Sequence, residues 1–247
     1  MSSSCSEQVP VRHYRYLDLV TAFFVAVLIV SNVASSAKII DLGFSLFGIP
    51  LAFDGGTLLF PVSYVFGDVL TEVYGFRASR RVIWIGFAAL ALSSLLFFIL
   101  RILPGETAWE SYAGSAAYDA ILGGMSTGGI TLASLLGYWA GAFSNAALLS
   151  KMKVLMKGKH LWVRTIGSTL AGEFLDSLIF VFIASLAGVF AWGLFVTLVF
   201  TNYLFKCLVE VIMTPITYLA VWKLKSAEGV DVYDEKVKFN PFQGERI

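Results

Sequence analysis

Charged residues are scarce in this sequence of 247 residues: Asp, Glu, Lys and Arg make up 14% of it, whereas hydrophobic residues make up 57%. A soluble domain carries about a quarter charged residues. Together with a mean hydropathy of +0.78, the composition excludes an ordinary soluble protein and predicts an integral membrane protein. The lipid bilayer is therefore the first expected partner, and the lack of a basic stripe argues against nucleic acid.

Cysteine, histidine and the common catalytic motifs are also rare or missing. Cys5 lies in a polar leader and Cys207 in an apolar stretch, so a disulfide framework is not expected. The two histidines, His13 and His160, lie in basic flanks, and no Walker A, GxGxxG, HExxH or paired-cysteine motif occurs. We therefore expect no cofactor, no bound metal and no enzymatic activity.

Long apolar stretches are what the sequence does contain. A helix needs roughly 20 apolar residues to cross a hydrocarbon core of about 30 Å. We predict an all-α membrane protein with six transmembrane helices in one bundle; a leader covers 1–16, the membrane domain 17–225 and a tail 226–247. The predicted helices cover residues 17–37, 57–74, 82–100, 121–150, 165–187 and 193–222.

Three shorter segments allow further expectations. A cleaved signal peptide is the alternative for the first helix, because residues 35–37 resemble a small-residue cleavage site. The glycine-rich stretch 41–56 predicts a re-entrant or irregular approach to the second helix. Residues 188–192 leave room for only a very tight turn between the last two helices.

Basic residues gather at alternate ends of the predicted helices. They precede the first helix and follow the second, fourth and sixth, whereas the segment after the third helix is acidic. By the positive-inside rule, this pattern places both termini in the cytoplasm. The basic residues are Arg12, Arg15, Arg77, Arg80, Arg81, Lys151, Lys153, Lys157, Lys159, Arg164, Lys223 and Lys225, and the acids are Glu106, Glu110 and Asp119.

A faint internal repeat relates the two halves of the chain. Residues 31–34 (SNVA) match 144–147 (SNAA), each followed by a lysine, and Gly67-Asp68 matches Gly172-Glu173. With three helices in each half, the pattern predicts a 3+3 inverted repeat with a site between the halves. Chance similarity between two apolar stretches is the alternative.

Two pairs of acids interrupt the apolar helices. Asp68 and Glu72 lie four residues apart and share a helix face with Tyr64. Glu173 and Asp176 lie three residues apart in a segment that has no nearby cation. Acids within a membrane helix usually face the protein interior or a polar cavity, so both pairs are candidate substrate ligands. For Glu72 an ion pair with the arginines at 77–81 is the alternative.

The last helix holds a third candidate group. Lys206 and Glu210 have the spacing of an ion pair within one helix, and Pro215 predicts a kink nearby. They either form that internal pair or line the substrate path. Three asparagines and a second tyrosine are weaker candidates, since they could equally serve in helix packing. These residues are Asn32, Asn145, Asn202 and Tyr203.

Three stretches, 61–87, 157–180 and 201–225, resemble the queuosine precursor transporters, also called the vitamin-uptake-like family. The resemblance covers about 17–225 and implies a six-helix bacterial inner-membrane protein that takes up 7-deazaguanine precursors of the tRNA base queuosine. The resemblance implies that the residues of this chain at the family's motif positions are functional. Those positions are Asp68, Glu72, Glu173, Asp176, Lys206 and Glu210.

The resemblance leaves the preferred precursor open, because Ala142 stands where relatives often have an acid. We hypothesise that Asp176 or Glu173 accepts the two parallel donors of a guanine-like edge, that Asp68 assists, and that Tyr64 or Tyr203 stacks on the ring. Transport by alternating access, with proton coupling as one version, is the leading prediction. A substrate-binding subunit of a larger importer and an intramembrane carboxylate enzyme are the alternatives, and a homodimer is a further candidate partner.

Overall fold

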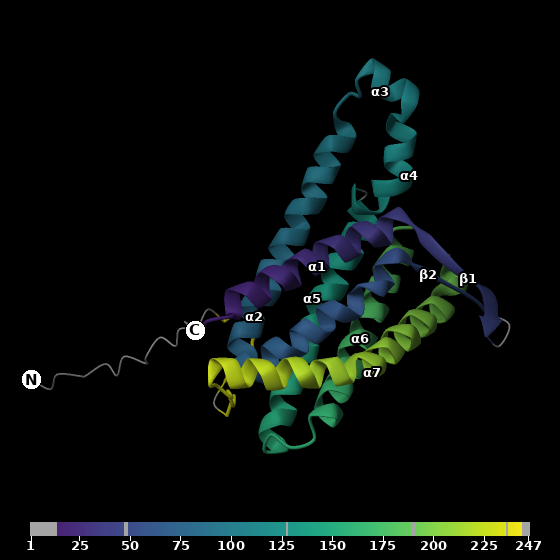
Figure 1. The fold of residues 1–247 in the computed structure, drawn as a ribbon. Helices are drawn as coiled ribbons and strands as arrows, with labels where there is room; N and C mark the ends of the chain where they lie inside the picture. Colours follow the sequence, from purple (N-terminus) through teal and green to yellow (C-terminus); the bar gives the residue numbers. More distant parts are fainter. Residues whose placement is uncertain (1–13, 47–48, 127, 189–190, 236, 244–247) are drawn as a thin grey trace, which may run out of the picture.

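The computed structural model describes residues 14–46, 49–126, 128–188, 191–235 and 237–243. The fold is helical, as predicted, and its long helices form one bundle (Figure 1). The helices are α1 (Leu17–Ala37), α2 (Phe60–Ile102), α3 (Thr107–Tyr112), α4 (Gly114–Ser126), α5 (Gly128–Leu155), α6 (Leu161–Leu186) and α7 (Phe195–Glu228). Most of the predicted leader, with Cys5, Arg12 and His13, lies outside the described residues.

Five helical segments among the described residues are long and apolar enough to cross a membrane. They are Leu17–Ala37, Val62–Ile102, Gly114–Leu155, Leu161–Leu186 and Phe195–Glu228. The second is interrupted at Gly75, where φ is +83° and ψ is 173°, so α2 is two helices joined at one residue. Division at Gly75 accounts for the six predicted helices.

Helix α2 restarts directly after this interruption, so the loop expected at Arg77–Arg81 is wrong: these residues are helical. A Cβ atom at residue 75 would lie 2.8 Å from Val232 and 3.0 Å from the Asp234 carboxylate, which leaves room only for glycine. Asp234 accepts a hydrogen bond of 2.7 Å from the Phe76 backbone N–H and so caps the new helix. Asp234 of the tail thus supplies the helix cap that the sequence around Gly75 does not provide.

Two connections are more regular than expected. The stretch predicted to be irregular forms an antiparallel hairpin of β1 (Ile39–Leu46) and β2 (Ile49–Asp54), with a shift of register between Asp41 and Ser45. Its glycines fit a bulged hairpin as well as a re-entrant loop, because both need positive φ, as at Gly43. The acidic segment after α2 forms α3 and α4 rather than a loop, and a 3-10 turn at Trp192–Leu194 precedes α7.

The bundle exposes apolar side chains and buries polar ones, the reverse of a soluble fold. Leu92, Val196 and Ile212 are each more than 60% exposed, whereas Asp68 and Glu173 are almost completely buried. Lipid tails are the environment in which such an exterior is stable. The protein is therefore a multi-pass membrane protein.

The start of α1 and the end of α7 lie in contact. The Glu228 carboxylate, at the end of α7, accepts hydrogen bonds from the backbone N–H groups of Arg15 and Tyr16 at 2.9 and 2.6 Å, where α1 begins. Tyr74, at the interruption of α2, donates to the same carboxylate at 2.9 Å. Figure 1 shows the start of α1 beside the end of α7.

The inverted repeat stays a prediction. Its paired asparagines make different contacts: Asn32 donates to the Leu28 carbonyl of its own helix at 2.8 Å, whereas Asn145 donates to Asp68 at 2.8 Å.

Candidate functional site

The acids of α6 lie near the middle of that helix. Glu173 is twelve residues from Leu161 and thirteen from Leu186, which is about 18–20 Å from either end of a helix that rises 1.5 Å per residue. Glu173 is 2% exposed and Asp176 is 6% exposed. Both face the interior of the bundle, as their spacing predicts.

Lys206 of α7 reaches across to these two carboxylates. Its ammonium nitrogen lies 3.1 Å from Glu173 Oε2 and donates a hydrogen bond to Asp176 Oδ2. The aromatic ring of Phe60 closes one side, with its centroid 5.2 Å from the nitrogen. An internal pair of Lys206 with Glu210 is therefore wrong for this conformation, because two desolvated acids on α6 attract the ammonium more strongly than one acid on its own helix.

Glu210 is left with an unsatisfied carboxylate. The residue is 2% exposed, and no described residue hydrogen-bonds to either of its side-chain oxygens. It lies within electrostatic range of Asp68, Glu173 and Tyr64. A buried carboxylate without a partner is costly, so Glu210 is a group that a proton, a ligand or a moving cation could satisfy.

Asp68 is the fourth buried acid in this region; we call Asp68, Glu173, Asp176 and Glu210 the inner acids. Asn145 of α5 donates to its Oδ1 atom at 2.8 Å, while among the described residues neither Asp68 Oδ2 nor Asn145 Oδ1 has a hydrogen-bond partner. The Asp68 side chain is completely buried. Two of the four polar side-chain atoms of Asp68 and Asn145 thus remain able to bond a ligand.

A small cavity adjoins these residues between α1, α2 and α5. Its volume is about 30 Å³, enough for a water molecule or two but too small for a two-ring base. Tyr64 and Asn145 line it, together with Phe24, Ser63, Gly67, Leu70, Thr71, Ser79, Val82, Ile83, Tyr138, Ala142 and Ala146. The cavity therefore has no room for such a base in this conformation, and its lining does not include Glu173, Asp176, Lys206 or Glu210.

Close packing of α5 on α6 brings the group together. A Cβ atom at Gly141 would lie 2.8 Å from Asp176 Cβ and 3.1 Å from the Tyr64 hydroxyl, so only glycine allows this approach. Gly137 packs against Asp176 in the same way. The prediction from sequence missed these glycines, although their spacing of four is the small-residue pattern of close membrane helices. It also missed Tyr138, which lines the cavity and donates to the Ile83 carbonyl at 3.2 Å.

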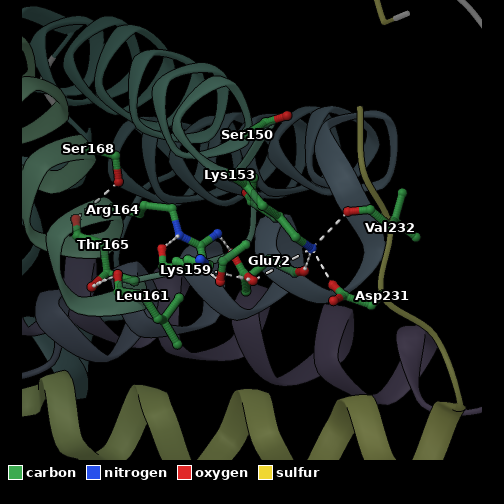
Figure 2. Close-up of polar contacts among 12 residues, drawn as sticks. Glu72, Ser150, Lys153, Lys159, Leu161, Arg164, Thr165, Ser168, Asp231 and Val232 are labelled. Atoms are coloured by element: carbon green, nitrogen blue, oxygen red, sulfur yellow. Dashed lines mark hydrogen bonds and ion pairs between the residues drawn. The ribbon is translucent and has the colours of Figure 1, made fainter. Parts of the chain in front are cut away.

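Glu72 belongs to a different group, which we call the Glu72 cluster: Glu72, Lys153, Arg164, Lys225 and Asp231. Arg164 donates to Glu72 at 2.5 and 3.2 Å, and Lys225 at 2.7 Å. Lys153 lies 3.6 Å from the same carboxylate and donates to the Glu72 carbonyl at 2.6 Å. Figure 2 shows Glu72 between Arg164 and Lys153, with Asp231 of the tail beyond.

The Glu72 cluster fits the anchoring alternative for Glu72. Its ion pairs run to Arg164 and two lysines from α5 and α7, in place of the expected arginines of α2. Partial burial opposes ionisation of Asp231, but hydrogen bonds from Lys153 and Lys225 outweigh this and lower its pKa. Through Asp231, which pairs with Lys153 and Lys225, the cluster ties the tail to the bundle.

Within the described part of the chain, the remaining candidates take no part in the ion pairs and hydrogen bonds of the inner acids. Asn32 is bonded within α1, and Asn202 is half-buried one turn before Lys206. Tyr203 packs edge-on against Phe174, with ring centroids 5.9 Å apart, and Phe174 is 46% exposed toward the lipid side. Tyr64 lines the cavity, and Tyr203 lies within electrostatic range of Glu173. Within the described part of the chain, no three His, Cys, Asp or Glu residues form a metal-binding group.

An apolar helical bundle with several buried acids and a lysine in its interior is typical of multi-pass membrane transporters. Residues 54–220 match the family described as putative vitamin uptake transporters. Because this match covers well over half of the chain, the protein belongs to that family of transporters and is not classed with enzymes.

Curated relatives carry more specific names. The chain is 28% identical over 166 residues to a probable queuosine precursor transporter of Bacillus subtilis (strain 168), covering 67% of this chain and 70% of that protein. It is 22% identical over 203 residues to a queuosine precursor transporter of Escherichia coli (strain K12), covering 81% and 84%. No solved structure matches the chain.

Proposed function

We propose that the protein imports queuosine precursors, 7-deazaguanines such as 7-cyano-7-deazaguanine, across the bacterial inner membrane for tRNA modification. The names of its relatives support the class of substrate. The observation that carries the proposal is the buried pair Glu173 and Asp176 beside Lys206, near the middle of α6.

The chemistry of the ligand suits this pair. A guanine-like ring presents N1–H and an exocyclic amine as parallel donors, which a carboxylate accepts with its two oxygens. Glu173 or Asp176 reads this edge, Asp68 and Asn145 contact the ring from α2 and α5, and Tyr64 stacks on its face. A base without the donors is rejected, because it would leave a buried carboxylate unpaired.

Transport proceeds by alternating access. The cavity of about 30 Å³ beside Tyr64 and Asn145 is too small for the base, so the bundle must rearrange to admit it, opening toward one side and then the other. The basic segments near Lys151, Arg80 and Lys225 support an orientation with both termini in the cytoplasm. A reporter that is active only in the cytoplasm should be active when fused to either terminus. Activity of a periplasm-specific reporter at one terminus would contradict this orientation.

Uptake by single-site variants tests the substrate site. In cells lacking their own importer, Asp176→Asn and Glu173→Gln should each reduce uptake of labelled 7-cyano-7-deazaguanine about 10- to 100-fold, the loss expected for hydrogen bonds to a charged acceptor. Asp119→Asn is the matched control, because Asp119 is exposed and pairs with Arg101. Undiminished uptake by both variants at normal surface expression would remove Glu173 and Asp176 from the site.

A further inference from the structure

Lys206 occupies the carboxylates that the proposed substrate needs. Its ammonium group pairs with Glu173 and hydrogen-bonds to Asp176. A guanine-like edge that takes both oxygens of either carboxylate must share Glu173 Oε2 or Asp176 Oδ2 with the lysine ammonium. Binding of a guanine-like edge therefore competes with Lys206.

Glu210 offers the displaced ammonium group another partner. It lies four residues after Lys206, so the two side chains lie on one face of α7. No described residue hydrogen-bonds to the Glu210 carboxylate, although the side chain is 2% exposed. The four-carbon lysine stem has the freedom to move from an acceptor on α6 to an acceptor one turn away on its own helix.

We infer that Lys206 is a tethered stand-in for the substrate's donors: it holds Glu173 and Asp176 in the empty carrier and pairs with Glu210 when the substrate takes its place. This inference rests on the proposed function. It assigns roles to Lys206 and Glu210, which do not bind the substrate in that proposal. The exchange keeps the lysine paired in both states, which avoids an isolated buried charge. Glu210 thus strengthens substrate binding without touching the substrate.

A double-mutant cycle on binding tests the exchange. The affinity of purified full-length protein for 7-cyano-7-deazaguanine is measured by calorimetry for the wild type, Glu210→Gln, Lys206→Met and the double variant. We expect Glu210→Gln to weaken binding about 10-fold in the wild-type background, because Lys206 loses its charged acceptor. In the Lys206→Met background, the same change should alter affinity less than about 2-fold, since nothing remains to be displaced.

Other outcomes overturn the inference. Equal weakening in both backgrounds would mean that Glu210 contacts the substrate directly, and no weakening in either would mean that it takes no part. If the wild type binds no 7-deazaguanine, the proposed function fails and the inference with it. If the wild type binds and the cycle is additive, only the inference fails.

A second measurement does not require the lysine variant to fold. Infrared difference spectra are recorded as the ligand is added to the wild type and to Glu210→Gln. We expect a carboxyl band that changes with ligand in the wild type and is missing in Glu210→Gln, because Lys206 arrives at Glu210 on binding. Identical difference spectra for the two proteins would overturn the exchange.

Discussion

At the scale of single residues, the buried acids fall into two groups that differ in how fully they are paired. Glu72 is surrounded by Arg164, Lys153 and Lys225, so its charge is satisfied within the protein. Asp68 and Glu210 keep carboxylate oxygens without partners among the described residues. A fully paired acid stabilises one structure, whereas a partly paired acid is available to a ligand.

Removal of the Glu72 charge should unfold the protein more readily. Glu72→Gln leaves Arg164 and Lys153, both at most 2% exposed, without their central anion, at a cost of about 3–5 kcal/mol. Thermal unfolding in detergent should show a clearly lower midpoint for this variant. The matched control is Glu235→Gln on the exposed surface of the tail; equal midpoints for both variants would contradict a stabilising role for Glu72.

At the scale of elements, the interruption of α2 and the tail depend on each other. Gly75 turns the chain, Asp234 caps the helix that follows, and Ser150 of α5 donates to the same carboxylate at 2.6 Å. The tail also accepts hydrogen bonds at Asn240 from Arg80 and at Pro241 from the Trp84 ring, at 3.0 and 2.9 Å. The tail is therefore part of the bundle's packing.

A side chain at the interruption should disturb both elements. Gly75→Ala forces a Cβ atom into a backbone region that is essentially restricted to glycine and into contact with Val232 and Asp234, at a cost of about 1–3 kcal/mol. Gly67→Ala in the same helix is the control, because a Cβ there meets nothing within 4 Å. Thermal unfolding compares the two; an unchanged midpoint for Gly75→Ala would show that the interruption does not need glycine.

At the scale of the whole molecule, the described interior holds four inner acids, and Lys206 pairs with two of them, Glu173 and Asp176. A single ammonium group cannot neutralise Asp68, Glu173, Asp176 and Glu210 together, so this site has carboxyl groups available to carry a proton with the cargo. Proton-coupled import by the chain alone is the version of the proposal that we favour.

Reconstitution in liposomes tests this version. We expect the purified chain to accumulate labelled 7-cyano-7-deazaguanine when an inward pH gradient is imposed, with collapse of the accumulation on addition of a protonophore. Equilibration that ignores the protonophore would rule out coupling and leave facilitated diffusion. No transport by the chain alone would favour a subunit of a larger importer.

Much of the architecture could be predicted because the governing physics is local. Runs of apolar residues identified the spans, and the positions of Glu173, Asp176 and Asp68 placed these acids inside the bundle, since lipid excludes them. The hairpin at Ile39–Asp54 was missed because glycine permits both bulged strands and loops. The partners of Glu72 and Lys206 were missed because they lie up to 153 positions away along the chain.

The sequence alone determined that this chain resides in a membrane, which apolar stretches form its long helices, and which acids must face inward, because each of these follows from burial and spacing along one helix. Only the tertiary structure decided the pairing: Glu72 with Arg164, Lys206 with Glu173 and Asp176, and Glu210 with no described residue. Pairing depends on which faces of the helices pack against each other. The glycines of α5 allow the close packing of α5 on α6 that positions Asp176.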